Sequence, residues 1–452
     1  MYKEFDMAIG YLKVKVFKDG TYIPIENAKI TITQNSQRNY RKTIKNLSTD
    51  LTGMTNVVEL ETPPLEYSMQ PSDKLPYGLC DIIVEASGYR RLTIRYCEIY
   101  PGITSIQDCY LNAEKTHEAN EDSIYVSEHT MIGDYEPKIP ESEEPKVWAS
   151  QLQEESITPD KQMIPYTITI HDGHPYNKRA RVYTVNYKDY IKNVAASEIY
   201  GTWPIEAIKA NVIAIISFTL NRLFTEWYFG KSNEYQITSS TAFDHKWTRG
   251  IAIPESIDKI VDEIFAVCIK KSNYEFPILT QYTDGKRVPH RQKWLSQWGS
   301  KELADQGRKA EEILKYYYGP DIEIVKIEKM GDLQKSYPGY SLQLGSKEES
   351  VKLVQEYLNT ISRHYPSITK LNVDGIFDDN TKKAVQTFQG IFNLSKSGVV
   401  DYSTWYKISD IYVGVTNTNF DNSTPQIIRT FIPPLFDRYS SSNFPTFTYP
   451  HI

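Results

Sequence analysis

Residues 187–224 read YKDYIKNVAASEIYGTWPIEAIKANVIAIISFTLNRLF. Apolar residues recur at three-to-four spacing on both sides of Gly201, which predicts two helices with one buried face each. Gly201 supplies the break expected after a helix, and Pro204 stands where a first turn tolerates proline. The sequence therefore predicts a helix that ends at Glu198 and a long core helix that starts near residue 205.

Helical patterns continue on both sides of this stretch and together cover residues 164–330. Two short strands are predicted first, at 166–170 and 181–185, and further helices are predicted at 256–270 and 300–318. The whole region is long enough for one domain with its own core. It is predicted to be a central, mainly α (α+β) domain.

The N-terminal 113 residues have a different pattern, with short runs in which apolar and polar residues alternate, such as LKVKV at 12–16. Turn residues at 19–20, 52–53 and 87–88 separate these runs. Alternation with period two indicates strands that bury one face. We expect residues 1–113 to form an antiparallel β-sandwich.

Residues 114–163 lose this regularity and include the run EPKIPESEEP at 136–145. A segment rich in acid and proline buries too little apolar surface to offset the entropy of ordering it. We therefore predict an exposed linker over 114–163. Exposed linkers are where proteases cut, and a cut is expected between Gly133 and Ile164.

The C-terminal part divides into a helical unit and a tail. Residues 340–411 contain two apolar helix faces, which predicts a small all-α domain. Residues 412–452 are rich in Pro, Ser, Asn and aromatic residues without a period, and are predicted to be an extended tail. The predicted fold class is thus multidomain: an N-terminal β-sandwich, a central mainly α domain and a C-terminal all-α domain.

The charge balance argues against two classes of partner. The 51 Lys and Arg residues face 57 Asp and Glu residues, so the net charge of −6 disfavours nucleic acid as a ligand. The most apolar stretch, 205–224, carries Glu206, Lys209 and Arg222, which a bilayer disfavours, so no membrane partner is expected. The Met1 end lacks the basic start and apolar run of a signal peptide.

The cysteines have no CxxC pair and no His at metal spacing beside them. Free buried thiols are predicted, and a bridge within the N-terminal unit stays open. The four residues are Cys80, Cys97, Cys109 and Cys268.

Ordered sequence blocks carry a resemblance to known families. The blocks YKDYIKNVAASE at 187–198, WPIEAIKA at 203–210 and SQWGS at 296–300 resemble the SpoIID/LytB family of sporulation lytic transglycosylases. The blocks LGS at 344–346 and VDGIF at 373–377 are similar to the peptidoglycan-binding type 1 domain. The N-terminal unit resembles the carboxypeptidase-regulatory or CnaB-like sandwich, and the domain order is similar to that of the spore cortex-lytic pro-enzymes.

The resemblance implies a substrate and a set of site residues. The substrate would be the glycan strands of spore cortex peptidoglycan, cleaved after a subtilisin-like protease removes the N-terminal prosegment in the germinating spore. Glu198 would be the catalytic acid. Substrate-binding residues would be Ser296, Gln297, Trp298, Tyr282, Thr283 and Asp284. Trp298 remains equally open as a core residue.

The position of Glu198 agrees with an acid role. A carboxyl in the last turn of a helix faces the negative end of the helix dipole, and apolar neighbours disfavour its anion further. A protonated Glu can donate to the glycosidic oxygen and then accept the proton of the sugar's C6 hydroxyl, which closes a 1,6-anhydro ring. Hydrolysis would need a second carboxylate. Glu206 is a candidate, although at a helix start it more plausibly complements the helix dipole.

Two other function classes remain open. His171 and His174 flank a Gly turn and would suit a zinc amidase, which cuts the peptide stem, but such residues are more often loop residues. The second alternative is a non-catalytic wall-binding protein. Some SpoIID proteins hold zinc through a His and Cys cluster, whereas residues 237–245 contain no Cys, so no metal and no cofactor are predicted there.

Overall fold

The computed structural model describes residues 7–35, 42–114, 121–133, 135–140, 163–228, 235–272, 274, 276–287, 293–331 and 336–416. Most of the region in which the activating cut is expected lies outside the described residues. The same holds for the predicted tail beyond residue 416.

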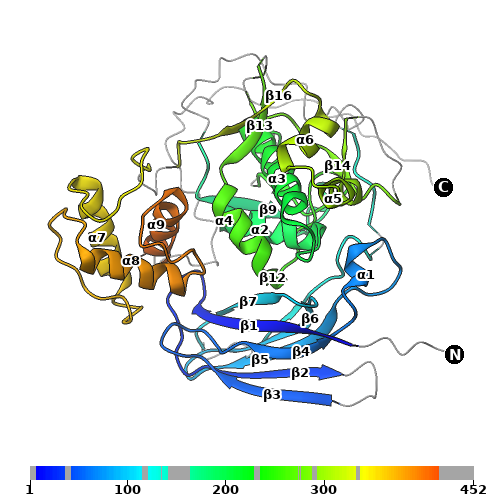
Figure 1. Cartoon of the computed structure of the whole chain (residues 1–452). Helices are drawn as coiled ribbons and strands as arrows, with labels where there is room; N and C mark the ends of the chain where they lie inside the picture. Colours follow the sequence, from blue (N-terminus) through cyan, green and yellow to red (C-terminus); the bar gives the residue numbers. More distant parts are fainter. Residues whose placement is uncertain are drawn as a thin grey trace, which may run out of the picture. The chain divides into compact units, whose positions relative to one another are not determined.

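Two β-sheets make up the N-terminal region, at the bottom of Figure 1. Leu12, Val14 and Val16 point into the space between the sheets and are fully buried, as the alternating pattern predicts. One sheet has the order β12-β7-β1-β4, with β1 (Ala8–Lys18), β4 (Val58–Thr62), β7 (Thr104–Leu111) and, from the central region, β12 (Ile253–Pro254). The other has the order β3-β2-β5-β6-β8, with β2 (Lys29–Asn35), β3 (Lys42–Ser48), β5 (Gly78–Glu85), β6 (Arg91–Ile99) and β8 (Glu121–Tyr125).

The sheets depart from the sequence prediction in two ways. They are mixed, because β1 pairs with β7 in parallel and β6 pairs with β8 in parallel, whereas an antiparallel sandwich was predicted. In addition, β8 lies inside residues 114–163, which were predicted to be linker. The sequence did not indicate this strand because it contains acidic residues. In the structure these residues have partners: Asp122 forms an ion pair with Arg90 (2.9 Å), and Glu121 accepts a hydrogen bond from Thr93 (2.8 Å).

The central region contains a three-stranded sheet of β10 (Val182–Asn186), β9 (Thr167–His171) and β11 (Ile237–Thr238). Its main helices are α2 (Tyr187–Glu198) and α3 (Ile205–Phe224), which begin and end where the sequence predicts. α3 is long and apolar enough to cross a membrane, yet 83% of its most apolar window is buried inside the fold, as in a core helix.

Two predicted helices of this region are each divided. The pattern at 256–270 gives α4 (Glu255–Ile264) and then a strand, β13 (Val267–Lys271), which pairs with β16 (Ile322–Lys326). The pattern at 300–318 gives α5 (Gln297–Asp305) and α6 (Ala310–Tyr318), because Gly307 between them adopts a φ of +86° that ends a helix. Two short strands, β14 (Tyr282–Thr283) and β15 (Leu295–Ser296), pair with each other, and β15 directly precedes α5 in the sequence.

The central region also adds a strand to the N-terminal sheets. β12 (Ile253–Pro254) pairs with the outer edge of β7 (Figure 1). Gly201, just after α2, lies against Pro254, and a Cβ on Gly201 would approach the Pro254 side chain to 2.2 Å. The short helix α1 (Glu66–Met69) joins here as well, since Trp203 Nε1 donates to the Ser68 carbonyl (2.9 Å). The N-terminal and central regions are thus joined by strand pairing and by side chains.

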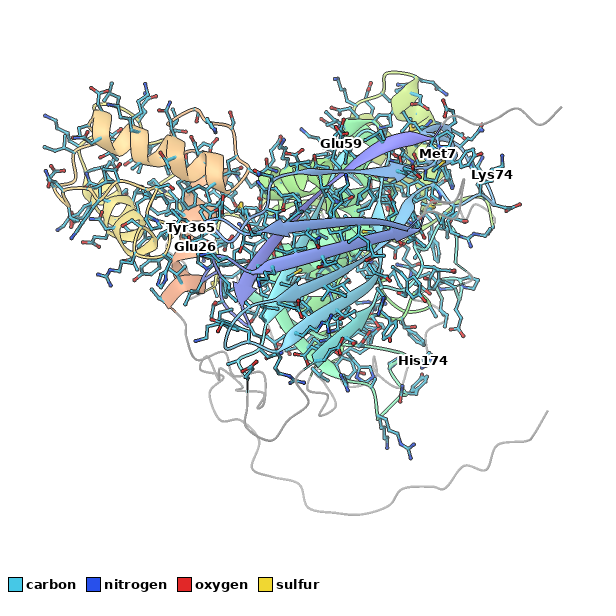
Figure 2. The ribbon with its side chains drawn as sticks, turned by 90° about the horizontal axis from the view of Figure 1, so that it is seen from below. Met7, Glu26, Glu59, Lys74, His174 and Tyr365 are labelled. Atoms are coloured by element: carbon cyan, nitrogen blue, oxygen red, sulfur yellow. The ribbon has the colours of Figure 1, made fainter. Side chains whose placement is uncertain are left out.

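Three helices form the C-terminal region: α7 (Glu349–Ile361), α8 (Asp379–Ile391) and α9 (Tyr402–Thr416). α9 runs five residues past the predicted boundary at 411, so the first residues of the predicted tail are helical. In Figure 2, Tyr365 lies at the end of the N-terminal sheets near Glu26, and its hydroxyl donates to the carbonyl of Tyr22 (2.7 Å). The C-terminal region therefore contacts the N-terminal region directly.

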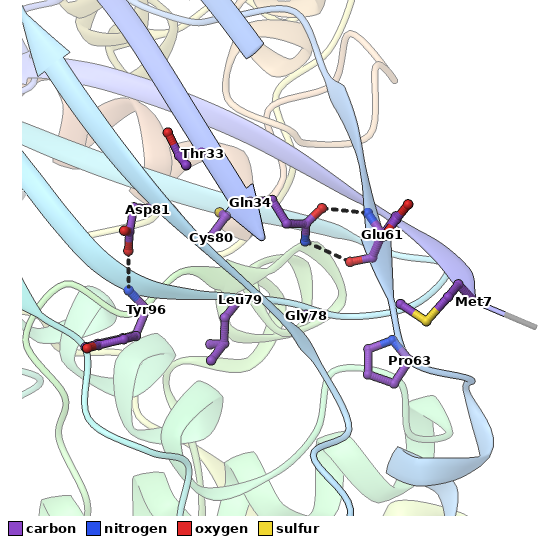
Figure 3. Close-up of a pocket in the computed structure, with 10 residues that line it drawn as sticks. All are labelled: Met7, Thr33, Gln34, Glu61, Pro63, Gly78, Leu79, Cys80, Asp81 and Tyr96. Carbon is purple, nitrogen blue, oxygen red and sulfur yellow. Dashed lines mark hydrogen bonds between the residues drawn. The ribbon is translucent and has the colours of Figure 1, made fainter. Parts of the chain in front are cut away.

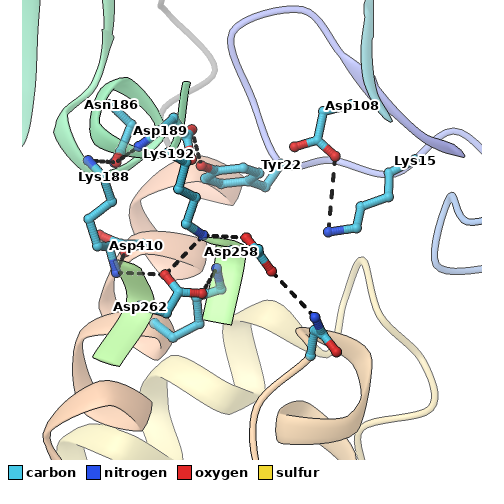
Figure 4. Close-up of polar contacts among 12 residues, drawn as sticks. Lys15, Tyr22, Asp108, Asn186, Lys188, Asp189, Lys192, Asp258, Asp262 and Asp410 are labelled. Carbon is cyan, nitrogen blue, oxygen red and sulfur yellow. Dashed lines mark hydrogen bonds and ion pairs between the residues drawn. The ribbon is translucent and has the colours of Figure 1, made fainter. Parts of the chain in front are cut away.

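A buried cluster of charges fixes α9 to the central helices (Figure 4). Lys407 of α9 lies 2.9 Å from Asp262 of α4, and Asp410 of α9 pairs with Lys188 of α2. Lys192 of α2 also contacts Asp262, at 3.0 Å. Burial alone would raise the pKa of Asp262, but the three lysines hold it well below its usual range. Removing any one partner would leave a buried charge uncompensated.

The N-terminal sheets hold two further buried features. All four cysteines are buried free thiols, as predicted, and Cys80 faces Cys97 across β5 and β6. A pocket of about 240 Å³ opens among the strand ends near Met7 and Glu61, where Gln34 holds the Glu61 backbone through two hydrogen bonds (Figure 3). Its lining residues all belong to the N-terminal region.

Glu98 of β6 is a buried acid among tyrosines. Its carboxyl accepts a hydrogen bond from Tyr100 (3.0 Å), and Tyr77 is a second hydrogen-bond partner. Burial raises the pKa of Glu98 from 4.5 to about 8, and the two tyrosines only partly oppose this. The folded protein therefore keeps this proton at neutral pH.

The Glu98 proton predicts how stability changes with pH. Because the folded pKa exceeds the unfolded one, the contribution of the neutral acid is complete below about pH 4.5 and is lost as pH rises towards 8. Glu98→Gln keeps a neutral side chain at all pH values. Between pH 5 and 8 the parent should therefore lose roughly 1.4 kcal/mol per pH unit relative to the variant. Urea unfolding at pH 5, 6.5 and 8 measures this difference, and parallel pH profiles would contradict it.

Candidate active site

Local sequence determines where α2 begins and ends. The side chain of Asn186 accepts hydrogen bonds from the backbone N–H groups of Lys188 and Asp189, which starts the helix directly after β10. Ile199 adopts an extended conformation, so Glu198 is the last helical residue. The Glu198 side chain is 5% exposed.

The carboxyl group of Glu198 is surrounded by hydrogen-bond donors. Oε1 accepts from the backbone N–H of Lys246 (2.8 Å). Oε2 lies 3.3 Å from Nε2 of Gln297 and 3.5 Å from the hydroxyl of Thr130. The sequence prediction of apolar neighbours is therefore wrong for the carboxyl itself, because donors from three distant segments reach it. Such donors hold the carboxyl in one orientation.

A buried ion pair positions the Lys246 N–H. Asp244, two residues earlier, accepts from Arg222 Nε (3.1 Å), from the Tyr228 hydroxyl (2.6 Å) and from the backbone N–H of Thr238 (2.9 Å). Both charged side chains are fully buried. The loop that begins at Asp244 is thereby tied to α3 and β11, and this places the next backbone N–H groups beside α2.

Tyr282, which lies on β14, adjoins Glu198. Burial raises the pKa of its phenol well above 10, and the neighbouring Glu198 raises it further, so the phenol keeps its proton as a donor. Its hydroxyl also lies 2.7 Å from Nδ1 of His245, whose ring stacks on the Tyr282 ring (5.7 Å, 11°). Burial lowers the pKa of His245 well below 6.5, and Lys138 and Arg222 lower it further, so this imidazole is neutral.

The sequence-predicted residues of the SQW block divide between roles. Gln297 donates to both the backbone carbonyl (3.2 Å) and the carboxyl of Glu198. Ser296 is the N-cap of α5 and accepts from the Gly299 N–H (2.9 Å). Trp298 packs on Trp203 (5.0 Å between ring centroids) and on Tyr200, so it lies in the core. Only Gln297 reaches the catalytic candidate directly.

The remaining predicted residues lie nearby in structural roles. Thr283 is buried on β14, paired with Ser296. Asp284 accepts from the backbone and side-chain N–H groups of Arg287 (3.2 and 3.1 Å), so it orients that guanidinium. Glu206 lies in the first turn of α3, as the sequence predicts, and its side chain also accepts from the Ala310 N–H (2.8 Å) at the start of α6.

His171 and His174 act as packing residues. Nε2 of His171 lies 3.2 Å from the carbonyl oxygen of His174, and its ring stacks on Tyr235 (4.4 Å). The His174 ring packs edge-on against Phe243 (4.8 Å). Within the part of the chain that the structure describes, no three His, Cys, Asp or Glu side chains gather as metal ligands.

A segment that follows β8 lies over the site. It comprises residues 126–140, of which the structure describes 126–133 and 135–140, and is called the strap below. His129 Nε2 lies 3.3 Å from the Ile199 carbonyl oxygen, and Met131 N–H donates to His129 Nδ1 (3.2 Å). Burial lowers the pKa of His129 to about 3, so the neutral ring donates from Nε2. The backbone N–H and hydroxyl of Thr130 both donate to the Ser197 carbonyl (3.2 and 2.8 Å).

The second half of the strap continues over the central region. Arg287 donates to the carbonyls of Thr130 and Gly133. Ile139 N–H donates to the Ala242 carbonyl (2.6 Å), and Gln281 Nε2 donates to the Ile139 carbonyl (3.2 Å). The strap therefore covers Glu198 and the surface between Ala242 and Gln281, although the sequence predicted an exposed linker here. Backbone hydrogen bonds, which composition does not reveal, hold it in place.

Two family models match parts of the chain. Residues 176–260 match the stage II sporulation protein family, SpoIID, and residues 347–408 match the peptidoglycan binding domain family. The chain carries both domains. The resemblance of the blocks at 187–198 and 203–210 to SpoIID, and of the block at 373–377 to the peptidoglycan-binding domain, is thereby confirmed. The two domains indicate a multidomain protein that acts on peptidoglycan in the cell wall or in sporulation. The SpoIID match includes Glu198 and Lys246.

Whole-protein comparisons add little. No curated protein matches the chain. Among solved structures, 3-chlorocatechol 1,2-dioxygenase from Rhodococcus opacus 1CP matches with 12% identity and a TM-score of 0.16. The match covers 28% of this chain and 62% of the length of that enzyme.

The Asp244 ion pair predicts a large loss of stability on substitution. Asp244→Asn leaves the Arg222 guanidinium buried without its counter-charge, which should cost about 3–5 kcal/mol. Asp321→Asn is the control, since its pair with Lys271 is exposed and its loss should cost much less. Urea unfolding of both variants compares the two costs. Similar costs would show that Asp244 does not hold the loop beside Glu198.

Proposed function

We propose that this chain is the pro-form of a lytic transglycosylase that cleaves the glycan strands of spore cortex peptidoglycan, with Glu198 as its acid and base. The observation that carries the proposal is the Glu198 carboxyl, held by Gln297 and by the Lys246 N–H at the end of α2 and covered by the strap. The SpoIID match over this region supports the reaction class.

The proposed reaction needs one carboxyl group. Protonated Glu198 donates its proton to the glycosidic oxygen, and the C1–O bond breaks with its electron pair passing to that oxygen. The C6 hydroxyl oxygen of the same sugar then bonds to C1, and its proton returns to Glu198. No water is consumed, and the product is a 1,6-anhydro sugar. The side chain of Glu206 caps α6, so it is committed to a structural role instead of that of a second carboxylate.

The strap supports the pro-enzyme part of the proposal. It donates to the last carbonyls of α2 and leaves Glu198 5% exposed, so a glycan strand cannot reach the carboxyl while the strap is in place. The chain between 140 and 163 joins the strap to the central region. A cut in that interval by a subtilisin-like protease separates them and leaves the strap attached to β8. The spore cortex-lytic enzyme SleC has a similar domain order.

The C-terminal region supports a wall-bound enzyme. Its match to the peptidoglycan binding domain family supports peptidoglycan as its partner. The buried charges that join α9 to α2 and α4 hold this region at a set distance from Glu198. We place the protein in the spore, at its cortex. Free peptide stems among the products would instead favour the amidase alternative, and no release at all would favour a non-catalytic binder.

The Glu198 proposal predicts a loss of product. In the protease-cut protein, Glu198→Gln retains the size of the side chain but cannot donate the proton, so release of anhydro-muramyl fragments should fall by at least about 100-fold. Mass spectrometry of fragments released from purified cortex measures this. Glu206→Gln is the matched control and should keep most activity. An active Glu198→Gln protein would remove Glu198 from the mechanism.

The contacts of the strap predict that the cut and uncut proteins release product at different rates. The uncut chain should release little product, and cutting between 140 and 163 should raise the rate by at least about 10-fold once the strap dissociates. Arg287→Ala removes the two hydrogen bonds to Thr130 and Gly133, so the uncut variant should already show part of this gain. Arg308→Ala, on the exposed surface, is the control. Equal rates for cut and uncut parent protein would exclude the pro-enzyme proposal.

A further inference from the structure

One side chain of the strap points into the central region. Lys138 is 7% exposed, and its Nζ lies 4.1 Å from the ring centroid of Tyr282 and 4.5 Å from that of Phe218. Both distances are in the range of cation–π contacts. Hydrogen bonds hold the strap on both sides of Lys138: Thr241 donates to the Glu136 carbonyl (3.0 Å), and Ile139 pairs with Ala242 and Gln281.

The two rings beside this ammonium belong to the central region. Phe218 comes from α3, and Arg222 of the same helix lies over its ring (5.0 Å). Tyr282 comes from β14 and is fixed by His245, whose neutral ring stacks on it and whose Nδ1 bonds its hydroxyl. His245 also packs on Phe218 (4.5 Å). The two rings therefore have supports that do not depend on the strap.

The position that the Lys138 ammonium occupies between the rings of Phe218 and Tyr282, called the pocket below, adjoins the candidate acid. Tyr282 presents its ring to Lys138, and the neighbouring Glu198 raises the pKa of the Tyr282 phenol. Glu198 and the Lys138 ammonium are thus both neighbours of the same tyrosine. A positive charge held by the strap occupies a position next to the group that would start glycosidic cleavage.

We propose that the pocket between Phe218 and Tyr282 receives, once the strap has left, the sugar ring that becomes positively charged at C1, and that Lys138 fills it beforehand with a charge of the same sign. This inference rests on the proposed role of Glu198 and goes beyond it by assigning Phe218 and Tyr282 to the charged ring. As the C1–O bond breaks, positive charge spreads over C1 and the ring oxygen. Aromatic ring faces attract such a charge.

A binding experiment on the full, uncut chain tests the pocket without cleavage. The probe is a protonated iminosugar carrying an acetamido group, with neutral N-acetylglucosamine for comparison. Lys138→Ala removes the strap's contacts with the two rings, so the strap should open more readily and the uncut variant should bind the iminosugar at least about 10-fold more tightly than the parent does in calorimetry. Lys138→Arg, which keeps the charge, should bind like the parent. Lys74→Ala is the matched control, because Lys74 also lies over a tyrosine ring (4.7 Å), at the opposite end of the sheets from Tyr365.

A second substitution separates the rings from Glu198. Phe218→Leu, added to Lys138→Ala, keeps an apolar side chain but removes one ring, and should weaken iminosugar binding by roughly 5-fold to 30-fold. Binding of neutral N-acetylglucosamine should change much less. In the protease-cut protein, Phe218→Leu should lower kcat more than it raises KM, because the ring acts on the charged state.

Three results would overturn the proposal: equal iminosugar binding by parent and Lys138→Ala, no loss on Phe218→Leu, or equal losses for the charged and neutral probes. Thermal unfolding verifies that each variant is folded, and Lys138→Met replaces Lys138→Ala if that variant unfolds. A different result would reject the proposed function and leave the pocket proposal standing. Lys138→Ala protein that binds the iminosugar, while the cut parent releases no anhydro fragments, would reject the transglycosylase and keep the pocket.

Discussion

The last turn of α2 is the constraint on which the site depends. A helix ends with carbonyl groups that have no partner within the helix, and here a carboxyl group stands among them. The chain satisfies these acceptors from several directions: Gln297 and the Lys246 N–H bond Glu198, and Thr130 bonds the Ser197 carbonyl. Because the donors come from distant segments, the helix end fixes the relative positions of those segments.

The same acceptors explain how the strap can be both well bound and replaceable. Its contacts with the central region are mostly hydrogen bonds to backbone groups, from side chains as well as from the backbone, and each is of modest net strength because water competes for the same groups. On the proposed function, the strap leaves, and the carbonyls of Ser197 and Ala242 and the side chains of Arg287 and Gln281 then need partners again. Hydroxyl and acetamido groups of a glycan supply donors and acceptors of the same kind. A site built to hold a peptide in this way is therefore suited to a polar sugar chain.

Whether the sequence could predict a feature of the fold or the site depends on how far apart along the chain the interacting residues lie. The bounds of α2 and α3 follow from local patterns and were predicted correctly. The role of Gln297 came from a resemblance, because nothing in the sequence near it indicates that it bonds a residue 99 positions earlier. The Lys246 contact uses a backbone N–H, which every residue except proline has, so no sequence signal marks it. Lys138 lies in an acidic, proline-rich run whose composition indicates exposure, whereas tertiary contacts bury it.

The buried charges at α9 extend the same reasoning to the binding domain. Desolvating Lys188, Lys192 and Lys407 is costly, and a packed apolar contact of the same size would be at least as stable. Ion pairs, unlike apolar contacts, are satisfied only when each charge meets its own partner, so Asp262 and Asp410 select one docking geometry. The position of the binding domain relative to Glu198 is therefore specified by charge matching. On the proposed function, this rigid arrangement would hold the glycan strand bound by the C-terminal domain at a constant position relative to Glu198.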